Sequence, residues 1–213
     1  MCLLALVGCG GAQATTGTPA CPRDRTVVLA EQADVDRLAG CETLTSVEIR
    51  TGAPLALGAL RSLEVITGDL VVGPTIALEE LTLLELREIG GTLQVASNAM
   101  LRGVFLPRLE RAGRVAIEAN AALATVSLPR LVTVTGSLLV TEGGSLELLT
   151  LSALRRVGKD LVITDNPKLA LVEAGALAEV LEVRVERNRV LPADQVSALT
   201  EKASVPPAKT SQP

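Results

Sequence analysis

The sequence predicts a mainly β protein: a right-handed parallel β-helix, or solenoid, of about seven coils of 22 or 23 residues with a short helical cap at each end. Two observations predict it. An alternating pair of apolar residues recurs seven times between Val47 and Val185, and a turn residue and then an invariant leucine follow each pair at fixed spacing. A single coil cannot enclose its own apolar face, but stacked coils bury a continuous core, which is the physical reason for such a period.

The first element of each repeat is an apolar residue, any residue and a second apolar residue, which is typical of a short strand with one buried face. The seven pairs are Val47/Ile49, Leu70/Val72, Leu93/Val95, Val115/Ile117, Leu138/Val140, Leu161/Ile163 and Val183/Val185.

A turn position follows three residues after each pair. It is occupied in order by Gly52, Thr75, Asn98, Asn120, Gly143, Asn166 and Asn188. Because Asn and Gly tolerate the left-handed conformation, we expect it at these positions. We also expect the inward Asn amides to bond the backbone of neighbouring coils.

Further apolar columns complete the interior, so that each coil directs about six apolar side chains inward. The columns are Leu55/Leu78/Leu101/Leu123/Leu146/Leu169/Leu191, Leu60/Leu83/Leu106/Leu128/Leu151, Leu63/Leu86/Leu109/Leu131/Leu154/Leu177 and Ile66/Ile89/Ala112/Val134/Val157/Val180. A corner that carries Gly68, Gly91, Gly113, Gly136 or Gly158 leads into the next strand. The two 22-residue repeats lose their residue at this corner, which keeps the buried columns aligned.

Amphipathic helices are the alternative explanation of a leucine-rich chain. They require apolar residues at i, i+3, i+4 and i+7 over about 11 or more residues. Segments such as Gly136–Val140 and Asp160–Ile163 are too short and too rich in branched residues for that pattern.

The solenoid ends need caps, because an open end exposes a sheet edge and the core. At the first end we expect a strand at Val27–Leu29 and a helix at Ala30–Ala39 that ends at Gly40. Cys21 and Cys41 bracket this unit, and a disulfide between them would close a loop of about 20 residues and contribute about 3 kcal/mol. Two unpaired buried thiols are the alternative.

At the second end, Pro192 suits the first turn of a helix that runs through Ala193–Lys202, with Val196 and Leu199 facing the last coil. The capped solenoid is therefore expected over residues 21–202. Residues 203–213 are rich in proline and polar residues without an apolar pattern, which predicts a disordered tail.

The stretch from Gly40 and Cys41 through Leu44, Val47 and Ile49 resembles the start of a receptor L domain, and units such as GTLQVASNAML (residues 91–101) resemble its later repeats. The family is the right-handed β-helix of insulin-type and epidermal-growth-factor-type receptors, with related repeats in bacterial and fungal cell-surface proteins. The resemblance covers about Cys21 to Leu199. It implies the fold and carries over no catalytic site.

The amino-terminal residues predict a lipid anchor. The segment Leu6, Val7, Gly8 and Cys9 resembles the lipobox of bacterial lipoproteins, which implies a signal peptide over residues 1–8 and acylation of Cys9. Residues 9–20 would form a flexible tether. The segment lacks Lys and Arg and is short, so we expect the true start to lie upstream. We expect the protein to be localised at the outer membrane of a cell envelope. The alternative is that the apolar start arose by chance and that Cys9 is a free thiol.

The composition argues against an enzyme. The chain has no His, Trp or Tyr and a single Phe, Phe105, which removes the usual general base and the commonest aromatic platforms. Carboxylates follow successive strands, namely Glu118, Glu142, Asp165 and Glu186, and we interpret them as solvated corner residues rather than a glycosidase pair. No cofactor or metal motif is present. The net charge of −4 argues against a nucleic-acid partner.

The outward residues in the middle of the strands form the candidate binding face, whose members are Val71, Gln94, Ala116, Leu139 and Val162. Polar neighbours flank this column, which predicts an apolar strip with a polar rim of the kind that marks contacts. Ordinary strand preference for branched residues is an equal alternative.

We therefore expect a non-enzymatic envelope protein whose solenoid binds a protein or a glycan. A structural envelope component without a discrete ligand and a carbohydrate-active β-helix enzyme are the two alternatives.

Overall fold

The computed structural model describes residues 21–204. The predicted signal peptide (1–8), the acylation of Cys9, the tether (9–20) and residues 205–213 of the predicted tail (203–213) lie outside the described residues. The first two residues of that tail, 203 and 204, belong to a 3-10 helix instead.

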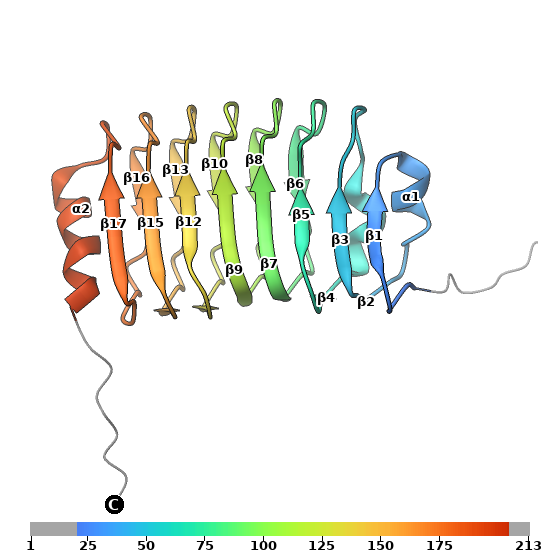
Figure 1. The fold of residues 1–213 in the computed structure, drawn as a ribbon, viewed down its shortest axis with the longest axis horizontal. Coiled ribbons are helices and arrows are strands. Elements are labelled where there is room, and N and C mark those ends of the chain that lie inside the picture. The colour runs from blue at the N-terminus through green and yellow to red at the C-terminus, as the bar shows by residue number, and fades with distance from the viewer. Residues whose placement is uncertain (1–20, 205–213) are drawn as a thin grey trace, which may run out of the picture.

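The predicted parallel β-solenoid of about seven coils is confirmed. Its largest surface is the long sheet, in which the strand after each corner pairs in parallel with the same strand of the next coil (Figure 1). In spatial order the strands are β1 (Thr26–Leu29), β3 (Ser46–Ile49), β5 (Leu70–Val72), β7 (Glu88–Ala96), β9 (Arg111–Glu118), β12 (Leu138–Thr141), β15 (Asp160–Thr164) and β17 (Glu182–Glu186).

Two narrower faces complete each coil. The short sheet contains β6 (Glu80–Thr82), β8 (Gly103–Phe105), β10 (Thr125–Ser127), β13 (Leu148–Thr150) and β16 (Leu171–Glu173). The third face contains β2 (Thr43–Leu44), β4 (Val65–Ile66), β11 (Thr133–Val134) and β14 (Arg156–Val157), together with the first residues of β7 and β9. In the first coil a 3-10 helix, η1 (Leu57–Ser62), stands where later coils have a strand of the short sheet.

The predicted inward columns form one core. Nearly all of their residues are buried, and Leu55, Val183 and Val185 at the two ends are only partly buried. The structure adds an apolar column that the sequence analysis missed. It lies on the short sheet and comprises Leu81, Val104, Val126, Leu149 and Val172.

The corners absorb the length difference between coils as predicted. Between β7 and β9, Ile89 lies opposite Ala112, but Thr92 lies opposite Arg114, so one residue is lost at the glycine corner. The corner glycines are required by close approach of the chain. A Cβ at Gly158 would lie 2.1 Å from the carbonyl oxygen of Thr135 in the preceding coil.

The turns after β7, β9, β12, β15 and β17 correct one prediction. The left-handed conformation falls one residue earlier than expected, on the residue before the Asn or Gly. These residues are Ser97, Ala119, Glu142, Asp165 and Arg187, with φ between 53° and 60°. The reason is that the turn residue itself points inward with an ordinary φ, which the left-handed residue before it makes possible.

The inward Asn amides bond neighbouring coils, as expected. Asn166 is fully buried; its Nδ2 donates to the carbonyl of Val140 at 3.0 Å, and its Oδ1 accepts from the N–H of Gly143 at 3.0 Å. Asn98, Asn120 and Asn188 donate to strand carbonyls of the preceding coil in the same way. Side-chain amides therefore join neighbouring coils by hydrogen bonds along the turn edge of the solenoid.

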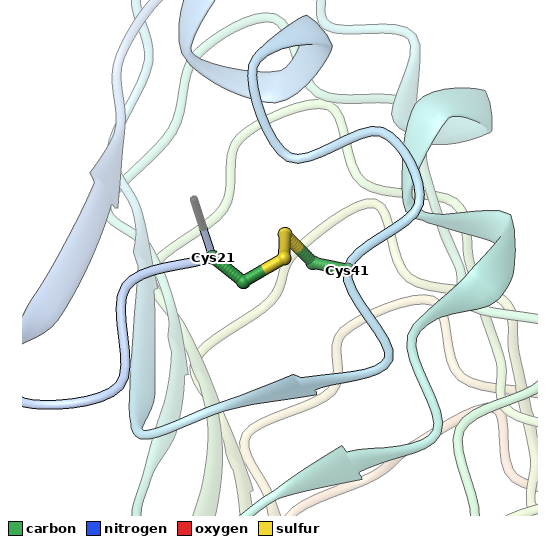
Figure 2. Close-up of a disulfide and its surroundings, with 2 residues drawn as sticks. All are labelled: Cys21 and Cys41. Carbon is green, nitrogen blue, oxygen red and sulfur yellow. A yellow bond between two sulfur atoms is a disulfide. The ribbon is translucent and has the colours of Figure 1, made fainter. Parts of the chain in front are cut away.

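The first cap has the predicted strand and disulfide but a shorter helix. Cys21 and Cys41 are bridged, with 5.6 Å between their Cα atoms, which replaces the alternative of two free thiols (Figure 2). Helix α1 covers only Gln32–Asp36 rather than Ala30–Ala39. It starts late because Asp34 Oδ2 accepts the N–H groups of Ala30 and Glu31, and it ends in tight turns that reach Gly40 at φ +84°.

The second cap is α2 (Ala193–Thr200), with Pro192 as its N-cap, followed by the 3-10 helix η2 (Glu201–Ser204). Leu199 is buried and Val196 packs against the core, as predicted. Two cap side chains also serve the backbone of the last coils. Gln195 Oε1 accepts the N–H of Val172, and Lys202 Nζ donates to the carbonyls of Gly175 and Leu177. Within residues 21–204, no helix has the length and hydropathy needed to cross a membrane.

Candidate binding face

The long sheet brings all five residues of the candidate binding face into one row. Strand register sets Val71 opposite Gln94, Gln94 opposite Ala116, Ala116 opposite Leu139 and Leu139 opposite Val162. Glu48 and Arg184 extend the row at its two sides, because these residues pair with Val71 and Val162. Period-two alternation turns every member away from the core.

The members of the row differ in how much they can offer a partner. Gln94 is exposed, whereas Val71, Leu139 and Val162 are half-buried. Ala116 is only 3% exposed because its small side chain lies between the longer Gln94 and Leu139. The strip that a partner could touch is therefore two apolar patches, Val71 and Leu139/Val162, on either side of Gln94 and Ala116.

Polar residues form the rim on the corner side, and several are fixed by hydrogen bonds. Asp69 Oδ1 accepts the N–H of Thr92 at 2.6 Å, and Ser137 Oγ donates to Asp160 Oδ2 at 3.3 Å. These bonds join neighbouring coils, so the rim is pre-ordered and would lose little conformational entropy when a partner binds.

Sequence reasoning missed one member of the row. Val28 on β1 lies opposite Glu48 and is 49% exposed, more than any apolar residue of the predicted strip. The signal was present, since the strand Val27–Leu29 was expected and its middle residue must face outward. Glu48 separates Val28 from Val71, which extends the alternation of apolar and polar positions along the sheet.

One of the carboxylates that follow the strands, Asp165, forms a two-point ion pair between neighbouring coils. Asp165 is held by Arg187 of the next coil, whose Nε and Nη2 donate to its two oxygens at 2.5 and 2.7 Å. The hydrogen bond from Arg187 is the main cause that lowers the pKa of Asp165 below 3.8. A general acid requires the opposite shift. Within residues 21–204, no cluster of three or more Cys, Asp and Glu residues could hold a metal ion.

No family model matches the chain, and the searches of curated proteins and of solved structures found no match either.

Proposed function

We propose that this protein is a non-enzymatic, lipid-anchored component of a bacterial cell envelope, related to the receptor L domains, whose long sheet binds a protein or glycan partner. The observation that carries the proposal is the outward row of the long sheet. Val71, Leu139 and Val162 face outward, where the fold itself does not require an apolar side chain.

The sequence and one disulfide support the lipid anchor and the localisation. The lipobox-like segment that ends at Cys9 supports acylation of Cys9 and localisation to the outer membrane, and the disulfide between Cys21 and Cys41 suits an oxidising compartment outside the cytoplasm. Mass spectrometry of the mature amino terminus tests this part. A diacylglyceryl-modified Cys9 as the first residue supports it, and an unmodified Cys9 within an intact chain refutes it.

The binding face is tested by affinity capture from native envelope with the full-length protein as bait. The double variant Val71→Asp, Leu139→Asp places charges in both apolar patches and should abolish capture of the partner while the far-ultraviolet circular dichroism stays unchanged.

The matched control is Ile76→Asp, Leu181→Asp, which makes two apolar-to-acidic changes at residues that are 66% and 71% exposed and lie outside the row. This control should capture as the wild type does. Equal capture by the row variant and the wild type would refute the proposed face, and a periodate-treated envelope distinguishes a glycan partner from a protein.

A further inference from the structure

A groove of about 550 Å³ lies beside the first strand of the short sheet, away from the candidate binding face. We name it the η1–β6 groove. One wall is η1 with the loop before it, and the other is β6 with the residues around it. Its lining includes Leu57 and Arg61 of η1, Glu80 and Thr82 of β6, and Glu79, Leu84 and Arg102 nearby. The size falls within the range of about 300–1,000 Å³ that ligand pockets occupy.

The groove exists because the short sheet stops at β6. In the first coil, η1 replaces the strand that would continue the sheet, and no backbone hydrogen bond joins η1 to β6. In parallel pairing, alternate residues of a strand bond to opposite neighbours. On the β8 side, the carbonyl of Glu79 accepts the N–H of Arg102, and the N–H of Leu83 donates to the carbonyl of Phe105. The backbone N–H and C=O groups of Glu80 and Thr82 therefore point toward the groove.

The other edge of the same sheet is treated differently. At β16, the N–H of Val172 donates to the side chain of Gln195, so the second cap satisfies that edge. Within residues 21–204, no side chain bonds to the outer backbone groups of β6. The Oγ1 of Thr82, on the wall of the groove, is also the one buried side-chain oxygen or nitrogen in the described part of the chain that lacks a hydrogen-bond partner. The first edge is left open where the last is closed.

Four charged side chains line the groove. Glu79 and Glu80 lie at the start of β6, with Arg102 beside Glu79 in the next coil, so this end carries two carboxylates and one guanidinium. Arg61 occupies the position in the first coil that Leu84 holds in the second, just past the end of β6. None of these four charged side chains forms an ion pair within residues 21–204. Glu79 and Leu84 are five residues apart, which is about 17 Å along an extended strand and equals the separation between the first and last residues of an extended hexapeptide.

We propose that the η1–β6 groove binds an extended peptide segment of a protein partner by β-strand addition, with a basic residue of the peptide at Glu79/Glu80 and an acidic residue at Arg61. The open backbone groups of β6 select an extended polypeptide, because only a peptide backbone offers donors and acceptors at strand spacing. The apolar side chains of Leu57 and Leu84 contact the residues between the two charges. This site is separate from the row on the long sheet and does not depend on it.

The test uses fluorescence anisotropy with full-length protein and two labelled hexapeptides, Lys-Val-Thr-Val-Thr-Glu and its charge-reversed form Glu-Val-Thr-Val-Thr-Lys. We expect saturable binding of one form, which fixes the strand direction, and at least a tenfold loss when proline replaces the residue paired with β6. Arg61→Glu should weaken binding of that form at least tenfold. The matched control Arg130→Glu changes another exposed arginine, outside the groove, and should have no effect.

A second variant tests the same site independently, in case Arg61→Glu fails to fold. Thr82→Pro removes an outward N–H on an edge strand, where proline is tolerated, and should abolish binding while the thermal transition persists. Absence of saturable binding by either peptide, or binding that is unchanged by both Arg61→Glu and Thr82→Pro, overturns the proposal. Preference for a neutral hexasaccharide over both peptides overturns it as well. The variant Val71→Asp, Leu139→Asp should retain peptide binding, so failure of this site and failure of the long-sheet face are distinguishable.

Discussion

Asn98 and Asn120 lie one above the other in successive coils, and the Oδ1 of Asn120 accepts both the Nδ2 of Asn98 at 3.0 Å and its backbone N–H at 3.1 Å. Both side chains are 1% exposed. One carboxamide oxygen thus satisfies two buried donors of the neighbouring coil. These hydrogen bonds matter mainly because they leave no buried donor without a partner. An unpartnered buried donor would cost about 1–3 kcal/mol of folding free energy.

Replacement of Asn98 by Leu should lower the free energy of unfolding by about 2–4 kcal/mol, because it leaves the carbonyl of Val72 and the hydroxyl of Thr75 without their partner. Urea denaturation measures the effect. Asn188→Leu is the comparison: this Asn is half-buried in the last coil, where water can replace its bonds, and we expect about 1 kcal/mol. Equal losses at the two positions would contradict the role of burial.

Removal of the disulfide by Cys21→Ser, Cys41→Ser should lower the free energy of unfolding by about 3 kcal/mol, since the bridge closes a loop of 20 residues. The first cap should open before the rest of the molecule. Hydrogen exchange measures this order, with faster exchange confined to β1 and α1 as the expected result and uniform acceleration over all coils as the contrary one.

The second cap offers a test of edge protection. Gln195→Leu removes the acceptor of the Val172 N–H and should lower stability by about 1 kcal/mol and promote self-association through the exposed β16 edge. Gln195→Glu keeps an oxygen at that position and should behave as the wild type at neutral pH. Thermal melting and analytical ultracentrifugation read the two effects, and identical behaviour of the Leu and Glu variants would show that the side-chain bond is unimportant.

The glycine corners should tolerate no side chain. In Gly158→Ala the new Cβ would lie 2.1 Å from a backbone oxygen of Thr135, so two coils must separate locally, and we expect a loss of about 2–4 kcal/mol. Gly175→Ala is the control, because no atom lies within 4 Å of its Cβ position. Chemical denaturation should place this control within about 0.5 kcal/mol of the wild type.

Acid should weaken the turn that contains Asp165. The hydrogen bond from Arg187 holds the pKa of Asp165 below 3.8, so the pair stabilises the folded state above about pH 4 and loses this contribution as the pH falls through the lowered pKa. Asp165→Asn should therefore flatten the decline in melting temperature between pH 4 and pH 2. Arg187→Gln should flatten it equally, and the double variant should add nothing; additive effects would show that the two residues do not act as a pair.

The sequence was sufficient for the long sheet because its strands place two inward residues on either side of an outward one. The alternation at Leu138 and Val140 is therefore visible in the chain. The short sheet was missed because each of its strands buries a single residue, such as Val126 between Thr125 and Ser127, and one buried residue has no period. Helix η1 was missed for a related reason, since Leu57 and Leu60 continue the apolar content of the chain while the backbone changes.

The candidate binding face was predictable as a row of residues, but the exposure of each residue was not. Its order follows from the repeat, whereas exposure depends on the size of lateral neighbours, and Ala116 is covered although it faces outward. The η1–β6 groove had no sequence signal, because it arises where one coil departs from the repeat. The left-handed turn position escaped prediction because its residues, among them Ala119 and Arg187, are of types that do not favour that conformation.

The left-handed position of the turns affects which amino-acid substitutions the fold can accept. The left-handed backbone at Ser97, Ala119, Glu142, Asp165 and Arg187 costs about 1 kcal/mol at each residue and is held by the inward turn residue that follows, not by the side chain of the left-handed residue itself. The position accepts a hydroxyl, a methyl, either carboxylate or a guanidinium at five successive coils. The solenoid thus carries a line of evolvable sites along one edge, at which surface chemistry can diverge from coil to coil while the scaffold remains the same.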